Sequence, residues 1–143
     1  MSTVPEISGV VPPLVTPLTK ERKVDEPALR RLVRYLHDGG VHGLFVLGST
    51  GEFPAFSREE RREIIRIVVE ENAGRLPVLA GVSDGSSESA ARNARDAEEA
   101  GADAIVATLP YYFLPSSDQV VLNHFRNVAG SVRTPLVLYN IPQ

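Results

Sequence analysis

The sequence contains no cysteine, which excludes a disulfide framework and a thiolate metal site. It also lacks long apolar runs, and the longest, residues 104–107 and 136–139, are far too short to span a bilayer. Residues 1–8 show neither the basic region nor the apolar region of a secretory signal. A cytoplasmic protein with no membrane partner is the simplest interpretation.

An excess of positive charge is missing as well. The chain carries 15 Lys and Arg against 18 Asp and Glu, and its net charge of −3 gives no electrostatic reason to expect a nucleic-acid partner. Neither G-x-G-x-x-G nor G-x-x-x-x-G-K-[ST] occurs, so no nucleotide cofactor is predicted. Of the 143 residues 43% are hydrophobic and 23% charged, enough for one ordinary folded core.

Short apolar runs alternate along the chain with longer amphipathic segments. The runs, each bounded by Gly or Pro, are residues 9–15, 44–47, 77–80, 104–107 and 135–139. Short, continuous apolar runs of this kind are typical of strands buried on both faces of a parallel sheet. We therefore predict five strands, with a helix between each pair.

The helices between these strands are marked by cap residues. The predicted starts are Asp25, Ser57 with Glu60, Ser87, and Ser116 with Gln119. Tyr35 lies inside the first helix, where we interpret it as a packing residue. Because a strand–helix unit recurs about every 30 residues, the pattern is that of a βα repeat.

A βα repeat suits either an open doubly wound sheet or a (β/α)₈ TIM barrel. The open sheet lacks its nucleotide-binding motif here. A complete barrel needs about 250 residues and eight units. We therefore expect residues 1–143 to form one incomplete domain, the N-terminal portion of a TIM barrel with about five βα units. The open edges would be covered by another copy or by the missing half.

In a barrel the working face is built from the loops that follow the strands. The most informative of these loops is Gly48-Ser49-Thr50-Gly51-Glu52, where two glycines allow a tight turn with inward N–H groups that suit a carboxylate. Taken alone, Gly48-Ser49-Thr50-Gly51 would be interpreted as an ordinary tight turn that connects a strand to a helix. We expect Glu52 to accept hydrogen bonds from amides of the loop rather than to act as a general acid.

Tyrosines also follow the expected strands, at Tyr111, Tyr112 and Tyr139. A tyrosine hydroxyl can relay a proton when it is hydrogen-bonded to another hydroxyl, although ordinary packing explains Tyr111 and Tyr112 equally well. The three histidines fall on separate elements, at His37, His42 and His124. We therefore predict structural roles for them and no metal site.

Five segments at the ends of the expected strands together resemble one family. They are Val15-Thr16-Pro17, Gly48-Ser49-Thr50-Gly51-Glu52, Ala80-Gly81-Val82, Pro110-Tyr111-Tyr112 and Leu138-Tyr139-Asn140-Ile141-Pro142. In this order they resemble the dihydrodipicolinate synthase and N-acetylneuraminate lyase family over essentially the whole chain. The resemblance implies a class I aldolase that binds pyruvate or a 2-keto acid as a Schiff base on a lysine, with no metal or other cofactor.

The resemblance also implies roles for individual residues. Ser49 and Thr50, with Gly51, would hold the substrate carboxylate. Tyr139 would donate and accept the proton beside the imine, and Ser49 would link it to Tyr112. In many members the residue matching Tyr112 reaches across from a neighbouring subunit, which implies a homo-oligomer, either a dimer or a tetramer.

The resemblance leaves the exact reaction open. In the family, the lysine follows the segment that matches residues 139–142. The lysines present here are Lys20 and Lys23, so we expect residues 1–143 alone to form no Schiff base. The candidates are a dihydrodipicolinate synthase, a sialic-acid lyase and a 2-keto-3-deoxy sugar-acid aldolase, with Ser49 and Phe113 favouring the last two. The alternatives are a non-catalytic half-barrel that serves as an assembly or regulatory subunit and, more weakly, an unrelated phosphate-binding barrel.

Overall fold

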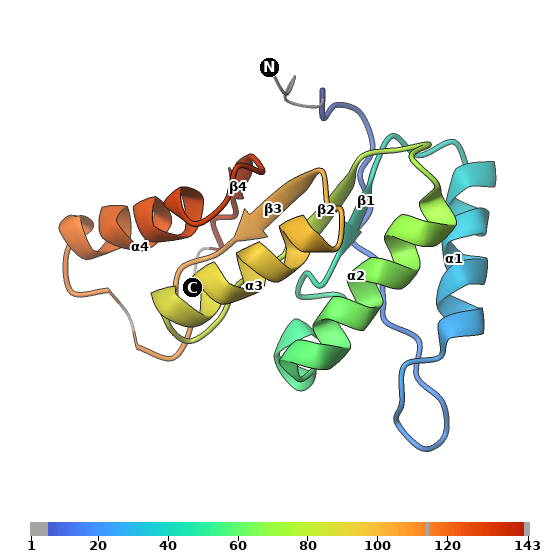
Figure 1. Ribbon diagram of the computed structural model, residues 1–143, viewed down its shortest axis with the longest axis horizontal. Coiled ribbons are helices and arrows are strands. Elements are labelled where there is room, and N and C mark those ends of the chain that lie inside the picture. Colours follow the sequence, from blue (N-terminus) through green and yellow to red (C-terminus); the bar gives the residue numbers. More distant parts are fainter. Residues whose placement is uncertain (1–5, 114, 142–143) are drawn as a thin grey trace.

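The computed structural model describes residues 6–113 and 115–141, which form one parallel sheet with helices on one of its faces (Figure 1). In chain order the elements are α1 (Glu26–Asp38), β1 (Leu44–Val46), the short 3-10 helix η1 (Phe53–Ala55), α2 (Arg58–Asn72), β2 (Val78–Gly81), α3 (Ser87–Glu99), β3 (Ala104–Ala107), α4 (Asp118–Gly130) and β4 (Leu136–Leu138). Within these described ranges no helix is both long and apolar enough to cross a membrane.

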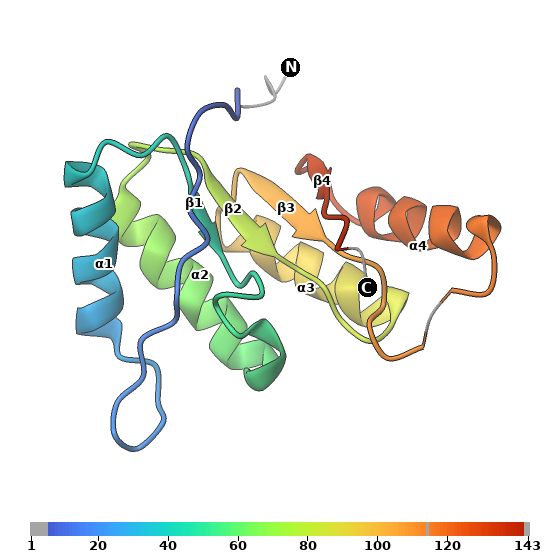
Figure 2. The same ribbon diagram turned by 180° about the vertical axis from the view of Figure 1, so that it is seen from behind.

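The sheet follows the order of the chain. Its four strands run β1-β2-β3-β4, every neighbouring pair is parallel, and a helix connects each strand to the next. Figure 2 shows the same sheet from behind, with the helices on its far side. A doubly wound sheet would reverse its strand order and carry helices on both faces, whereas a barrel does neither. The arrangement confirms the N-terminal portion of a TIM barrel.

The prediction of a first strand at residues 9–15 is wrong. This segment runs beside β1, but its only ladder contact is a single parallel bridge between Pro13 and Phe45. Hydrogen bonds still tie it down, from the Leu14 N–H to the Phe45 carbonyl (2.8 Å) and from the Phe45 N–H to the Pro12 carbonyl (3.2 Å). Because Pro12 has no N–H to donate toward β1, a continuous ladder cannot form here.

Two of the four predicted helix caps are confirmed. The Asp25 carboxylate accepts the Ala28 N–H, and Ser57 and Glu60 form both bonds of a capping box. Ser87 is the first residue of α3, with Ser86 as its N-cap.

The predicted start of the fourth helix is wrong. The N-cap of α4 is Ser117, not Ser116, and the Ser117 side chain makes no capping bond. The Gln119 amide does not reach back to the cap, because it donates to the Asn123 side chain (2.8 Å) instead.

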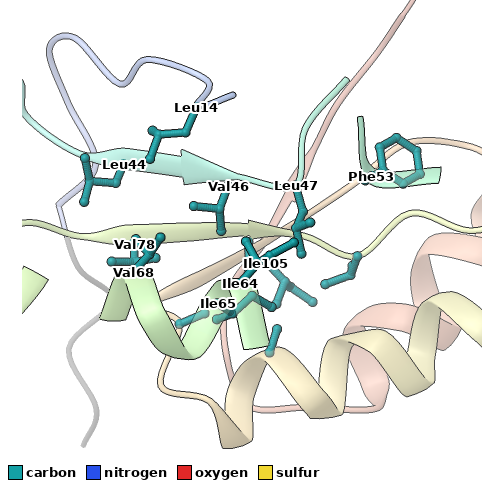
Figure 3. Packing of buried hydrophobic residues seen from close by; sticks show 14 of the residues in the cluster. Leu14, Leu44, Val46, Leu47, Phe53, Ile64, Ile65, Val68, Val78 and Ile105 are labelled. Carbon is teal, nitrogen blue, oxygen red and sulfur yellow. The ribbon is translucent and has the colours of Figure 1, made fainter. Parts of the chain in front are cut away.

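The main hydrophobic core lies between the sheet and the helices (Figure 3). Strand residues such as Val46, Val78 and Ile105 meet Ile64 and Val68 of α2, and all five are at most 1% exposed. The inner face of α3 is mostly alanine, with Ala90, Ala94 and Ala97 fully buried, which lets this helix approach the sheet closely.

The prediction of a packing role for Tyr35 is wrong, because its side chain is 73% exposed. The buried residues of α1 are Leu29 and Val33. Tyr35 lies two residues beyond Val33 and so, at about 100° per residue, points to the opposite side of the helix.

The other face of the sheet carries a much smaller cluster. Leu79, Ala104 and Val106 are buried there, against the partly buried Ile7, Val11 and Phe45. Burial on both faces is confirmed for β2 and β3 but wrong for β4, where Leu138 is 60% exposed. Among the described elements β4 pairs only with β3, so it is an edge strand.

Candidate active site

The candidate site lies where the loops after the strands meet, at the carboxyl ends of β1, β3 and β4. A cavity of about 410 Å³ opens there. The lining residues that matter for its chemistry are Ser49, Phe53, Thr108, Tyr111 and Tyr139. The structure thus brings together two predicted site residues, Ser49 and Tyr139, from strands that are not neighbours in the sheet.

The loop after β1 folds as a tight turn with two unused donors. The Gly51 N–H donates to the Gly48 carbonyl (3.1 Å), and the Glu52 N–H donates to the Ser49 carbonyl (3.0 Å). Within the described part of the chain, the N–H groups of Ser49 and Thr50 donate no hydrogen bond. Two adjacent free amides beside a serine hydroxyl are suited to binding a small anion.

The glycines of this loop are needed for space rather than for their backbone freedom. Neither Gly48 nor Gly51 has a positive φ, whereas Leu47 (56°) and Glu52 (55°) adopt the left-handed conformation. A Cβ on Gly48 would lie 2.9 Å from the Phe45 ring, and one on Gly51 would lie 3.0 Å from the Leu14 carbonyl oxygen. The tight turn was therefore predicted correctly, but from the wrong property of glycine.

The predicted role of Glu52 is wrong. Its side chain is exposed and makes no hydrogen bond with any described residue. The loop is held instead by Thr16, whose hydroxyl donates to the Gly51 carbonyl (2.9 Å). This bond ties the segment before α1 to the candidate site.

Aromatic contacts fix two tyrosines at the cavity. The ring of Tyr139 packs edge-on against Phe45, with centroids 6.4 Å apart, and its N–H donates to the Ala107 carbonyl (2.9 Å). Tyr111 packs edge-on against Phe53, at 5.7 Å. The two tyrosines are 38% and 41% exposed, so each has one side against the protein and one toward the opening.

Other predicted site residues do not line the cavity. Tyr112 is 78% exposed, and its ring contacts Phe113 at a centroid distance of 4.8 Å. The side chain of Thr50 is exposed, and Gly51 is buried beneath the turn. Among the described residues no hydrogen bond joins Ser49 to Tyr112 or to Tyr139.

Several residues of the cavity were not among the predicted site residues, and Phe53 and Thr108 are the two that matter most for its chemistry. Thr108 directly follows β3, so the rule that selects residues at strand ends could have found it. Phe53 begins η1 and has no comparable signal. Its ring lies under the guanidinium of Arg61, 5.5 Å from ring centroid to Arg61 Cζ, and this cation is itself only 8% exposed.

The three histidines lie far apart in the fold and bind other groups. His37 contacts the Asn72 side chain (3.0 Å) on α2, and His42 accepts the Val10 N–H (3.0 Å) before β1 begins. His124 is buried in α4, and burial lowers the pKa of its imidazole, partly offset by its hydrogen bond to Thr108. In the part of the chain that the structure describes, no three His, Cys, Asp or Glu side chains could hold a metal ion together.

Comparisons with known proteins agree on one family. Residues 6–143 match the description "Dihydrodipicolinate synthetase family". The chain is 41% identical over 138 residues to the 4-hydroxy-tetrahydrodipicolinate synthase of Methanopyrus kandleri, covering 96% of this chain and 46% of that relative. It thus spans about half the length of the curated relatives that it matches.

Solved structures show the same likeness. YagE, a prophage protein of the dihydrodipicolinic acid synthase family from Escherichia coli K12, crystallised in complex with pyruvate, superposes with a TM-score of 0.89 at 38% identity over 94% of this chain and 45% of its own. The N-acetylneuraminate lyase of Mycoplasma synoviae gives a TM-score of 0.83 at 31% identity over 92% of this chain and 46% of its own.

Proposed function

Because this chain belongs to the Dihydrodipicolinate synthetase family, we propose that it forms the pyruvate-binding part of a Schiff-base aldolase-type enzyme. Such an enzyme makes or breaks a carbon–carbon bond using pyruvate or another 2-keto acid. One observation carries the proposal: Ser49 and Tyr139 line one cavity, beside a turn with two unused amides. A related protein, YagE, crystallised with pyruvate.

The carboxylate of the substrate would bind at the loop after β1. The amides of Ser49 and Thr50 and the Ser49 hydroxyl can donate to its two oxygens, and donors held in place before binding need little reorganisation. The proposed contribution of Gly51 is to let the loop pass close to Leu14, because its own N–H is already engaged within the turn.

Tyr139 would move the proton next to the imine. Its ring is held by Phe45, and its exposed side faces the opening that Ser49 also lines. A hydroxyl fixed at one edge of a cavity can act as general acid and base, provided that a second hydroxyl relays the proton. We assign that relay to Ser49 and, from a neighbouring copy in a homo-oligomer, to Tyr112, which points away from its own cavity.

We propose that neither lysine in the sequence is the nucleophile of this site, because neither lies at the position that the family's lysine takes beyond Tyr139. Lys20 and Lys23 lie in the loop closed by the Leu18–Val24 bridge and by the bond from the Thr19 N–H to the Lys23 carbonyl (2.8 Å).

Two measurements test these proposals. Equilibrium dialysis with labelled pyruvate should show saturable binding that weakens about tenfold or more in Ser49→Ala, because a hydrogen bond to a charged group is lost. Tyr35→Phe, on the far side of α1, is the matched control and should bind as the unaltered chain does. No saturable binding would contradict the proposed function.

Borohydride reduction in the presence of pyruvate, followed by intact mass, tests the nucleophile. We expect no adduct on these 143 residues. An adduct on Lys20 or Lys23 in good yield would show that the assignment of the nucleophile outside them is wrong.

A further inference from the structure

The main chain at Thr108 is held by side chains on both of its polar groups. The Thr108 N–H donates to the Ser83 hydroxyl (2.9 Å), and the Thr108 carbonyl accepts from His124 Nε2 (3.0 Å). Both partners are nearly inaccessible, with Ser83 4% and His124 2% exposed. Thr108 is the first residue after β3, so these bonds replace the sheet ladder at the point where the chain enters the cavity wall.

The hydrogen bonds of His124 fix its tautomer. A carbonyl can only accept, so Nε2 carries the proton that it donates to Thr108. Because burial lowers the pKa of this imidazole below its ordinary 6.5, the ring is neutral at pH 7.5, so Nδ1 is the acceptor and receives the Ser87 hydroxyl (2.9 Å) at the start of α3. A neutral imidazole with both nitrogens engaged thus joins α4, α3 and the end of β3.

Arg61 braces the same region from the other side. Its guanidinium donates to the Ser83 carbonyl (3.2 Å) and to the carbonyl of Phe56 (3.2 Å), and Phe56 is the residue that follows η1. It also lies over Phe53, whose ring contacts Tyr111, three residues beyond Thr108. One chain of contacts therefore links the loops that follow β1, β2 and β3 behind the candidate site.

We propose that Ser83 and His124 are positioning residues, which fix the main chain at Thr108 so that residues 109–113 leave β3 in one direction and Tyr111 meets the cavity. The importance of this for catalysis rests on the proposed function; the restraint on the loop does not. Apolar side chains would fill these buried positions without the desolvation of polar groups. The side chains of Ser83 and His124 instead form hydrogen bonds with the main chain of Thr108, a residue that lines the cavity, and His124 also bonds to the Ser87 hydroxyl.

The test uses ¹⁵N-labelled full chain and four variants. His124→Gln keeps a donor near the position of Nε2, whereas His124→Asn is too short to reach Thr108. Ser83→Ala removes the acceptor of the Thr108 N–H. His42→Gln alters the histidine–main-chain bond before β1, and is the matched control.

Three results are expected. His124 side-chain ¹⁵N shifts show the neutral Nε2–H tautomer at pH 7.5. The Thr108 amide exchanges about five- to tenfold faster in Ser83→Ala, as for the loss of one buried hydrogen bond, while the Ile105 amide is unchanged. Backbone order parameters of Leu109 and Tyr111 stay at about 0.85 in the unaltered chain, in His124→Gln and in His42→Gln. In His124→Asn they fall below about 0.6.

The inference is overturned by an Nδ1–H tautomer, by unchanged exchange of Thr108 in Ser83→Ala, or by equal order parameters in His124→Gln and His124→Asn. None of these readouts contains pyruvate. Failure to bind pyruvate would therefore remove the proposed function and leave the positioning of residues 109–113 intact.

Discussion

The two faces of the sheet differ in how completely this chain covers them. On the helical face Val46, Val78 and Ile105 are at most 1% exposed and pack against α2. On the other face the buried cluster is limited to Leu79, Ala104 and Val106, and Val137 of β4 is 37% exposed. From β1 to β3 the helical face is covered by the helices of this chain, whereas the open face borders the candidate site.

This difference separates stability from chemistry. The helical face buries apolar residues through contacts that the βα repeat provides within each unit. The cavity instead depends on polar groups from loops after different strands, which are brought together only by the parallel sheet. We therefore expect substitutions on the helical face to change the free energy of unfolding, and substitutions at the cavity to change binding.

The same substitution on the two faces tests the comparison most strongly. Val46→Ala should lower the free energy of unfolding by about 2 to 3 kcal/mol, because it removes buried methyl groups and leaves a cavity. Val137→Ala on the open face should cost less than about 1 kcal/mol. Urea unfolding of both variants measures this, and equal costs would mean that the open face is covered in solution.

Gly81, the last residue of β2, lies directly against the main chain of Leu47. A Cβ at this position would overlap the Leu47 carbonyl oxygen, a main-chain atom that cannot rotate away. Gly81→Ala should therefore destabilise the chain by about 1 to 3 kcal/mol and disturb the loop that begins at Gly48. Gly85→Ala is the control, since a Cβ there meets nothing within 4 Å, and it should leave the midpoint of thermal unfolding nearly unchanged.

Two serine N-caps on the helical side should behave differently. The Ser57 hydroxyl accepts the Glu60 N–H in a capping box, whereas Ser117 caps α4 without a side-chain bond. Ser57→Ala should cost about 1 kcal/mol of unfolding free energy, and Ser117→Ala only a few tenths. Equal losses in chemical denaturation would show that the capping box contributes nothing to α2.

Mild acid should affect the cavity wall before the helical face. Burial lowers the pKa of His124 below its ordinary 6.5, so the unfolded chain binds a proton more readily. The buried neutral His124 therefore makes its full contribution to the free energy of unfolding above pH 6.5. This contribution is lost as the pH falls through the lower pKa that His124 has in the folded chain. Below 6.5 the unaltered chain should lose more stability than His124→Gln, as measured by urea unfolding between pH 7.5 and 5.5.

The carboxylates of the helical face respond only in stronger acid. Hydrogen bonds from Arg30 and Arg66 lower the pKa of Glu70, and bonds at the Ser57 cap lower that of Glu60, both from 4.5. Their contribution is present above pH 4.5 and is lost as the pH falls through the lowered values. Stability losses common to the unaltered chain and His124→Gln should therefore begin only below about pH 4.5.

Structural features that depend on neighbouring residues could be predicted from the sequence, whereas features that depend on distant residues could not. The strand at residues 104–107 and the caps at Asp25 and Ser57 depend on neighbouring residues, and all three are confirmed. The prediction of a strand at residues 9–15 was wrong because it considered only the apolar content of the segment. It did not consider that Pro12 lacks the N–H that a ladder with β1 requires. Its pairing partner, β1, lies more than thirty residues away in the sequence.

The site was predictable as a set of strand-end residues but not as a geometry. Ser49 and Tyr139 both line the cavity, because parallel strands end at the same edge of a sheet, while their roles in binding and catalysis stay predictions. The bonds from Ser83 and His124 to Thr108 join residues 25 and 16 positions apart, and no local pattern marks them. The prediction that Glu52 accepts hydrogen bonds from the loop was wrong. Its backbone is left-handed and its side chain is exposed, and the local sequence pattern does not encode either feature.

The central claim is that the loop after β1 holds the carboxylate of a 2-keto acid. A titration of ¹⁵N-labelled chain with pyruvate, followed through its amide resonances, tests this claim most directly. The account predicts saturable shifts that are largest at the Ser49 and Thr50 amides and much weaker in Ser49→Ala. Shifts that are absent from these two amides, or that concentrate on residues away from the cavity, would contradict it.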